Sequence, residues 1–350
     1  MAAYTTIDDP SAYFKVQLYT GTGSSNAITF NDTDTDMQPD AVWIKQRDST
    51  DAHVLFDAVR GVEKMLQPNT TGQEGDESTT LTAFGSDGFT VGSDSATGSS
   101  SGSYVSWNWK AGTTSGINAT GADITPSGYS FDQTSGFSVV AYTGSASSGD
   151  ALPHGLGAVP HMMIVKARTA VTEGWFVYHH KHNATPEDYG SRLDTTAVPS
   201  DNTIWNDTVP TSVLVQFSAG DGVNGSANYI AYFFTSKQGF SKFGGYEGNG
   251  NADGTFVYTG FRPAFVMIKD IDATGHWYLY DAKRDGYNPD QDYLQIADTA
   301  AEVTTDTIDL VSNGFKCRLA TRINSSSTFI YAAFAEAPFV NSNGIAGCAR

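Results

Sequence analysis

The stretch Pro39-Asp40-Ala41-Val42-Trp43-Ile44-Lys45 has two close relatives further along the chain. They are Pro160-His161-Met162-Met163-Ile164-Val165-Lys166 and Pro263-Ala264-Phe265-Val266-Met267-Ile268-Lys269. In each, a proline opens a mostly apolar run that a lysine closes, which is the pattern of a buried β-strand entered from a turn. We call these three segments the anchor strands and expect them to organise the fold.

The spacing of the anchor strands indicates domain-sized copies. Ile44, Val165 and Ile268 are 121 and then 103 residues apart (165 minus 44; 268 minus 165), far more than a solenoid repeat. An opening strand precedes each anchor, and a bulge is expected at the glycines of the longer third copy. The opening strands are Phe14–Gly21, Phe137–Gly144 and Phe240–Gly248.

Two further landmarks follow each anchor strand. A second alternating run comes first, at His53–Asp57, Trp175–His179 and Trp277–Asp281. A closing strand comes last, with aromatic residues at its first and sixth positions, at Tyr104–Trp109, Tyr229–Phe234 and Phe329–Phe334. Turns containing Asp87-Gly88 and Asn313-Gly314 precede the first and third closing strands, and such dipeptides accept positive φ.

These landmarks predict an all-β protein made of three tandem antiparallel β-sandwich domains of jelly-roll or lectin-like type. The expected domains are residues 1–112, 136–238 and 239–350, with a Gly/Ser/Thr-rich linker at 113–135. The five residues Thr235–Gly239 are so short a join that the second and third copies should sit rigidly together.

Composition limits the possible partners and compartments. The formal net charge of -18, with only 20 Lys and Arg, argues against a nucleic-acid partner. The first ten residues do not resemble a signal peptide, and no apolar run is long enough for membrane insertion. Cys317 and Cys348 imply no disulfide framework, although a single bridge between them stays open.

Several of these segments resemble a known family. Ala3–Pro10, Leu18–Gly21, Trp43–Lys45, Phe56–Gly61, Ser86–Phe89 and Tyr331–Phe339 are similar to a domain of unknown function found in bacteriophage tail-fibre and other virion proteins, common in marine phages, here in three tandem copies. The resemblance spans nearly the whole chain. It implies a virion location, with assembly in the host cytoplasm and exposure on the particle surface. It also implies other virion proteins as partners and a homo-oligomer, whose subunit number no heptad or triple-helical segment specifies.

Candidate sites in the sequence each have a structural alternative. His180 and His182 fall on one strand face, which suits either a metal site or a polar strand end. The acidic loops around Asp32–Asp36, Glu74–Glu77 and Tyr287–Asp292 suit either Ca²⁺ sites or solvated loops, and solvated loops are favoured. Neither a metal nor any other cofactor is predicted. Asp57 with Arg60 and Asp281 with Arg284 are interpreted as structural ion pairs, with His179 and His182 at the matching offsets.

Aromatic residues are the remaining candidates for ligand binding, because flat rings stack on sugars. Trp43, Trp107, Trp109, Trp175 and Trp277 fall on expected strands and are assigned to the core. Trp205 lies outside the repeated landmarks, so it is the predicted ligand-binding contact, against the alternative of a buried loop anchor. No catalytic motif occurs.

The sequence therefore favours a non-enzymatic virion structural protein, a tail appendage, fibre or surface decoration that contributes to host contact or particle stability. A carbohydrate-binding adhesin that recognises host surface glycan is the alternative function. A capsular polysaccharide depolymerase is a third, since paired carboxylates are identified only by their separation in a fold.

Overall fold

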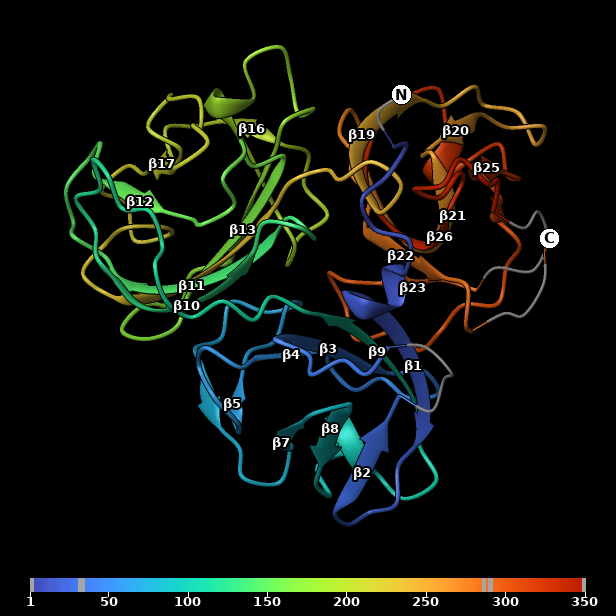
Figure 1. Cartoon of the computed structure of the whole chain (residues 1–350), viewed down its shortest axis with the longest axis horizontal. Helices are drawn as coiled ribbons and strands as arrows, with labels where there is room; N and C mark the ends of the chain where they lie inside the picture. Colours follow the sequence, from blue (N-terminus) through green and yellow to red (C-terminus); the bar gives the residue numbers. More distant parts are fainter. Residues whose placement is uncertain (1–2, 31–34, 285–287, 289–291, 348–350) are drawn as a thin grey trace.

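The protein is built of open antiparallel sheets, as the sequence predicts. The computed structural model describes residues 3–30, 35–284, 288 and 292–347. Three large sheets surround a common centre, so that the chain forms three lobes (Figure 1). We call residues 14–109 the first lobe, 126–234 the second lobe and 241–338 the third lobe.

Each lobe contains the same four-strand order: opening strand, closing strand, anchor strand, second run. The first sheet is β1 (Phe14–Thr20), β9 (Ser103–Trp109), β3 (Ala41–Gln46) and β4 (Val54–Asp57). The second is β10 (Pro126–Asp132), β11 (Phe137–Thr143), β18 (Asn228–Phe234), β13 (Met162–Ala167), β14 (Trp175–His179), β15 (Tyr189–Arg192) and β16 (Ser200–Asp201). The third is β19 (Ser241–Glu247), β26 (Thr328–Pro338), β21 (Phe261–Asp270), β22 (Trp277–Asp281) and β23 (Leu294–Gln295).

The register of pairing is also shared by the three sheets. Ala41, Met162 and Phe265 occupy one position, because each pairs with the last aromatic residue of its closing strand. On the other side these residues pair with Asp57, His179 and Asp281. Residues at corresponding places in the three lobes are therefore identified by backbone pairing as well as by sequence spacing.

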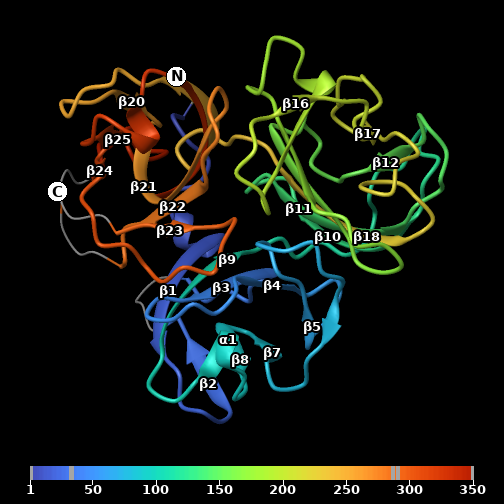
Figure 2. The ribbon, with the colours of Figure 1, turned by 180° about the vertical axis from the view of Figure 1, so that it is seen from behind.

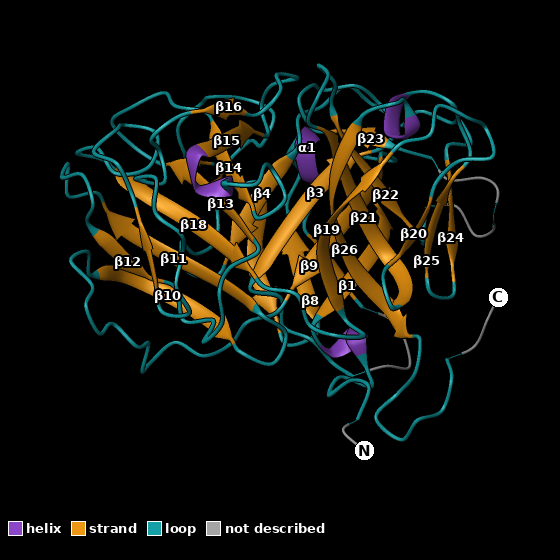
Figure 3. Ribbon diagram, turned by 90° about the horizontal axis from the view of Figure 1, so that it is seen from above, coloured by secondary structure: helices purple, strands orange, loops and turns teal. Residues whose placement is uncertain are grey.

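Small sheets lie on the outer side of the lobes, away from the centre (Figure 2). They are β2 (Asn26–Thr29), β8 (Gly88–Val91) and β7 (Leu81–Gly85); β12 (Ala151–Pro153) and β17 (Leu214–Gln216); and β20 (Phe256–Tyr258), β25 (Gly314–Cys317) and β24 (Ile308–Val311). A hairpin joins β5 (Lys64–Met65) to β6 (Gly75–Asp76). The helices are short, α1 (Ser95–Gly98) and the 3-10 turns Pro10–Ala12, Pro186–Asp188 and Arg322–Asn324, and strands dominate the view from above (Figure 3).

The anchor strands are apolar throughout because both of their faces are covered. Successive side chains of a strand point to opposite faces. Val42 and Ile44 belong to the core inside the first lobe, whereas Ala41 and Trp43 belong to the core shared by all three lobes. A strand covered on both faces shows a continuous apolar run instead of an alternation.

Two expectations about local structure differ from what is observed. The predicted bulge in the third opening strand was wrong, since β19 pairs with β26 without a shift of register. Gly244 is there instead because a Cβ would lie 2.6 Å from the hydroxyl of Tyr331. Within the expected linker 113–135, residues Pro126–Asp132 form β10 and pair with β11. Tyr129 and Phe131 give this Gly/Ser-rich segment apolar side chains that pack on the second lobe.

Candidate functional site

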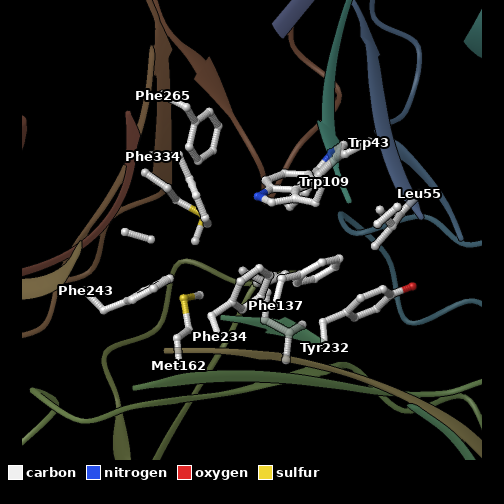
Figure 4. Close-up of a pocket in the computed structure, with 15 residues that line it drawn as sticks. Trp43, Leu55, Trp109, Phe137, Met162, Tyr232, Phe234, Phe243, Phe265 and Phe334 are labelled. Atoms are coloured by element: carbon white, nitrogen blue, oxygen red, sulfur yellow. The ribbon is translucent and has the colours of Figure 1, made fainter. Parts of the chain in front are cut away.

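The centre of the molecule is an aromatic core to which all three lobes contribute (Figure 4). Trp109, Phe234 and Phe334 are the seventh residues of β9, β18 and β26, and they form a triangle. Their ring centroids are 6.4 Å (Trp109 to Phe234), 5.7 Å (Trp109 to Phe334) and 6.0 Å (Phe234 to Phe334) apart. A cavity of about 30 Å³ remains among the surrounding side chains, and a cavity lined by apolar groups stays dry. This centre joins the lobes and offers no polar group to a ligand.

The joint between the first and second lobes is a buried ionic network. Arg60 Nε lies 2.5 Å from Asp57 Oδ2, and neither side chain has exposed surface. The hydroxyl of Tyr232, from the second lobe, donates to the same carboxylate oxygen over 2.6 Å. Asp57 therefore pins its own turn and also accepts a hydrogen bond from the neighbouring lobe.

Glu74 extends this network to a second cross-lobe contact. It accepts from Arg60 Nη1 at 3.0 Å and from Arg168 Nε and Nη2 at 2.9 and 2.8 Å. Burial acts to raise the pKa of Glu74, but the hydrogen bonds from Arg168 and the charge of Arg60 outweigh it, so its pKa is lowered. The carboxylate is thus held ionised between two guanidinium groups.

The joint between the third and first lobes repeats this arrangement. Arg284 Nε lies 2.6 Å from Asp281 Oδ2, again without exposed surface on either side chain, and the indole N–H of Trp107 donates to Asp281 Oδ2 over 3.1 Å. Glu302 takes the place of Glu74, because it bonds both Arg284 Nη1 at 2.7 Å and Arg47 Nη2 at 2.7 Å. The sequence predicts the pairs Asp57 with Arg60 and Asp281 with Arg284, but it indicates neither their burial nor their partners in the neighbouring lobes.

The joint between the second and third lobes contains histidines where the other two contain ions. His179 and His182 take the places of the Asp and the Arg. His179 Nε2 lies 3.2 Å from the carbonyl oxygen of Tyr331, and His180 Nε2 lies 2.9 Å from that of Phe243. Since carbonyls only accept, both rings carry their proton on Nε2. Burial lowers the pKa of His182 to about 3. Burial also lowers the pKa of His179 well below its usual value.

A ring N–H closes each joint at one further equivalent position, the start of the second run. His53 Nε2 lies 2.9 Å from the carbonyl of Gln295. Trp175 Nε1 donates to the backbone carbonyl of Gln67 over 2.9 Å, and Trp277 Nε1 donates to the backbone carbonyl of Arg192 over 3.0 Å. Each of these contacts runs from one lobe to the next, so the three joints form a closed ring.

The lysines that end the anchor strands are buried, with no exposed surface at Lys45, Lys166 or Lys269. Lys166 Nζ donates to the carbonyl of Thr71 in the first lobe at 3.3 Å, and Lys269 Nζ donates to Thr196 in the second lobe at 3.1 Å. Burial lowers the pKa of each of the three lysines to about 8. The sequence pattern indicates these residues only as strand ends.

The histidine and acidic segments show no metal geometry. Within residues 3–30, 35–284, 288 and 292–347, no group of three or more His, Cys, Asp or Glu side chains is arranged to hold a metal ion. Glu74 belongs to the ionic network, and Asp76 pairs with Lys64. Asp32, Asp34 and Tyr287–Asp292 other than Asn288 and Asp292 lie outside the described residues, as does Cys348. Cys317 is buried, which raises the pKa of its thiol to about 12.

The structure confirms the predicted burial of five tryptophans and corrects the predicted exposure of the sixth. Trp43, Trp107, Trp109, Trp175 and Trp277 are all buried, as expected. Trp205, predicted to be an exposed ligand contact, is only 1% exposed and packs in the core of the second lobe. Its indole N–H donates to the carbonyl of Tyr189 over 2.9 Å. The residue therefore anchors the long loop from the inside, because the indole has both an apolar core and an acceptor there.

Within the part of the chain that the structure describes, the exposed aromatic residues are on β20. Phe256 and Tyr258 are 47% and 46% exposed, and Tyr258 lines a hollow of about 360 Å³ with Tyr4, Lys242 and neighbouring polar residues. A larger hollow of about 640 Å³ lies around Asp40, Lys110 and Tyr129, between the first and second lobes. Both Asp40 oxygens already accept hydrogen bonds, from Ser130 and from the amide of Ala111. The alternation Phe256-Val257-Tyr258 was the sequence signal for the β20 pair, but it lies outside the shared landmarks.

Comparison with known proteins places these features in a family. No described helix is long and apolar enough to span a membrane. No curated protein and no solved structure matches the chain. One family model covers residues 9–338, and so all three lobes together. The chain belongs to the family described as a domain of unknown function (DUF7483).

Proposed function

We propose that this chain is a non-enzymatic virion structural protein, a tail appendage, fibre or surface decoration, made of three tandem β-sandwich domains around one shared core. The shared strand order and the outer small sheet of each lobe support the sandwich description. The phage location rests on the similarity of Leu18–Gly21, Phe56–Gly61 and Tyr331–Phe339 to virion domains.

The observation that carries the structural role is how the ionisable groups are used. An enzyme needs ionisable side chains that face a cleft and remain free to exchange protons with a substrate. Here Asp57, Asp281 and His179 are buried and face a neighbouring lobe instead. Their hydrogen-bonding capacity joins one lobe to the next, which suits a rigid particle component.

Labelling of purified phage particles with antibody raised against the full chain tests the proposal. We expect the chain to be present at a fixed copy number per particle and its label to lie on the tail or on the capsid surface. Absence of the chain from washed particles overturns the proposal. A depolymerisation assay on host envelope polysaccharide separates the enzymatic alternative, for which we expect no soluble product.

A further inference from the structure

Among the described residues, the aromatic side chains that are exposed lie together on one strand. Phe256 and Tyr258 are both on β20, while Val257 between them is 6% exposed and faces the lobe. Strand β20 is at the edge of its sheet, because it pairs with β25 alone. The cross-strand partner of Tyr258 is Gly314, which has no side chain to cover the ring.

The ring of Tyr258 is held in place on one side. The hydroxyl of Tyr4 donates to the carbonyl of Gly260 over 3.0 Å and lies 3.0 Å from the hydroxyl of Tyr258. Since the Tyr4 proton is used, Tyr258 donates to Tyr4 and keeps a lone pair for a further donor. Lys242 Nζ donates to the carbonyl of Tyr258 over 2.7 Å and lies 5.3 Å from its ring centroid.

The hollow beside this ring is polar without being acidic. Its other lining residues are Ser236, Gln238, Ser241, Phe243 and Thr259. The lining thus combines aromatic faces, hydroxyls, an amide and one ammonium group, and it contains no carboxylate, although the chain has a formal net charge of -18. Its volume of about 360 Å³ lies in the range of small-molecule sites, roughly 300–1,000 Å³.

We propose that this hollow binds a saccharide ring stacked against Tyr258. The apolar C–H face of a sugar packs on an exposed aromatic ring. Its hydroxyls hydrogen-bond the remaining lone pair of Tyr258 and the amide of Gln238, whereas the hydroxyls of Ser241 and Thr259 already bond the backbone of the fold. Phe256, two residues along the strand on the same face, provides a second ring for the next unit of an oligosaccharide. The Lys242 ammonium favours sugars that carry a carboxylate over neutral ones. This site goes beyond the structural role proposed above and does not depend on it.

A protein partner fits these observations less well. Specific protein–protein interfaces bury about 1,200–2,000 Å² in total. Two aromatic side chains beside a small concave hollow provide far less contact surface than that. The concave shape and the mixture of ring and hydroxyl groups instead match the way in which one sugar unit is held.

Calorimetric titration of the full chain with oligosaccharides of glucose, galactose and mannose, and with oligogalacturonate, tests this site. We expect at least one of the four to bind, and Tyr258→Ala to weaken that binding by roughly two- to tenfold, the equivalent of losing one stacking contact. Phe256→Ala, which removes no hydrogen bond of the fold, should weaken longer oligosaccharides more than monosaccharides. Val209→Ala, at a valine that is 58% exposed, is the matched control and should bind like wild type.

Lys242→Gln then distinguishes the two sugar classes, since loss of the ammonium group should weaken oligogalacturonate binding more than it weakens the binding of neutral oligosaccharides, which depend on Lys242 only through its contact with Tyr258. The proposal is overturned if none of the probes binds at millimolar concentration. It is also overturned if both Tyr258→Ala and Phe256→Ala bind like wild type while their thermal unfolding is unchanged. Because none of these measurements uses virions, failure here leaves the virion proposal standing, and absence from virions leaves this site standing.

Discussion

The two ionic joints and the histidine joint solve the same packing problem with different chemistry. The joints of the first lobe with the second and with the third each bury an Asp–Arg pair, a bridging Glu and a cross-lobe donor. The joint of the second lobe with the third contains His179 and His182 at the matching positions. The backbone geometry is shared, so the difference lies in the side chains alone.

The reason for the difference is on the opposite side of the joint. Trp107 and Tyr232 give a side-chain donor to each Asp, but the equivalent residue in the third lobe is Ala332. A carboxylate facing Ala332 would lack that donor and would lie near the carbonyl of Tyr331, which repels it. A neutral histidine donates to that carbonyl instead. The two buried Asp–Arg pairs thus occur where the neighbouring lobe supplies a side-chain donor, and the neutral histidine occurs where the neighbouring lobe supplies only a carbonyl.

The largest effect is expected from removing one member of a buried pair. Asp57→Ala leaves Nε of Arg60 and the hydroxyl of Tyr232 without the acceptor that they share, and loss of one partner of a buried ion pair costs about 3–5 kcal/mol. Urea unfolding monitored by tryptophan fluorescence measures this change in the free energy of unfolding. Asp76→Ala, which removes the exposed pair with Lys64, is the control and should cost less than about 1 kcal/mol. Equal effects of the two substitutions would contradict the importance of burial.

Replacing the histidines of this joint by an Asp–Arg pair should lower the free energy of unfolding after the first substitution. The second substitution should restore part of that loss. His179→Asp buries a carboxylate without a partner and should reduce the free energy of unfolding by about 3 kcal/mol. Adding His182→Arg supplies the missing guanidinium, so the double variant should regain a substantial part of that loss. Recovery in this double-mutant cycle would confirm that the positions are equivalent, and an additive further loss would show that they are not.

Acid should act on the buried histidines, His179 and His182 in one joint and His53 in another, before it acts on the carboxylates of the ionic joints. The pKa of His182 is about 3 in the folded protein and about 6.5 when unfolded. Below pH 6.5 the unfolded chain therefore takes up a proton that the folded one does not, and stability falls as the pH approaches 3. Glu74 and Glu302, whose pKa values are lowered, contribute stability that is kept above their unfolded pKa, about 4.3, and is lost below it.

Unfolding free energies at pH 8 and pH 5 test this order. His182→Gln should remove about 2 kcal/mol of the loss between these two values, from about 1.36 kcal/mol per pH unit below 6.5. Glu74→Gln should lower stability at both pH values while leaving the difference between them unchanged. A wild-type difference that His182→Gln does not reduce would refute the assignment.

The smallest effect is expected at the rim of an ionic joint. Arg168 is 18% exposed at its side chain and binds Glu74 through two nitrogens. Arg168→Lys keeps the charge but loses the forked geometry, so it should cost about 1 kcal/mol. Thermal unfolding at low and high salt measures the change. The third lobe has Ile271 at the equivalent place, and Ile271→Lys, which has no matching Glu, should gain nothing.

Much of the scaffold was predictable because its signals are local. The anchor strands, opening strands and closing strands were located within a residue or two, except that the third closing strand continues to Pro338, since period, turn residues and apolar runs are read over short windows. The candidate site was less accessible. Trp205 looked exposed because it lies in a polar loop, whereas Phe256 and Tyr258 looked ordinary because they lie in a strand, and exposure depends on what packs above a residue.

The sequence by itself determined that this is an all-β chain with three matching strand sets, and that an aromatic residue occupies the same position in each closing strand. Only the tertiary structure decided that Trp109, Phe234 and Phe334 meet at one centre, and that Asp57 accepts from Tyr232, 175 residues further along the chain. The physical reason is that strand pattern follows from neighbouring residues, whereas the partner of a buried charge depends on how whole sheets are placed against one another. That placement also lets the Asp57–Arg60 pair, which holds a turn of the first lobe, contact the second lobe through Tyr232.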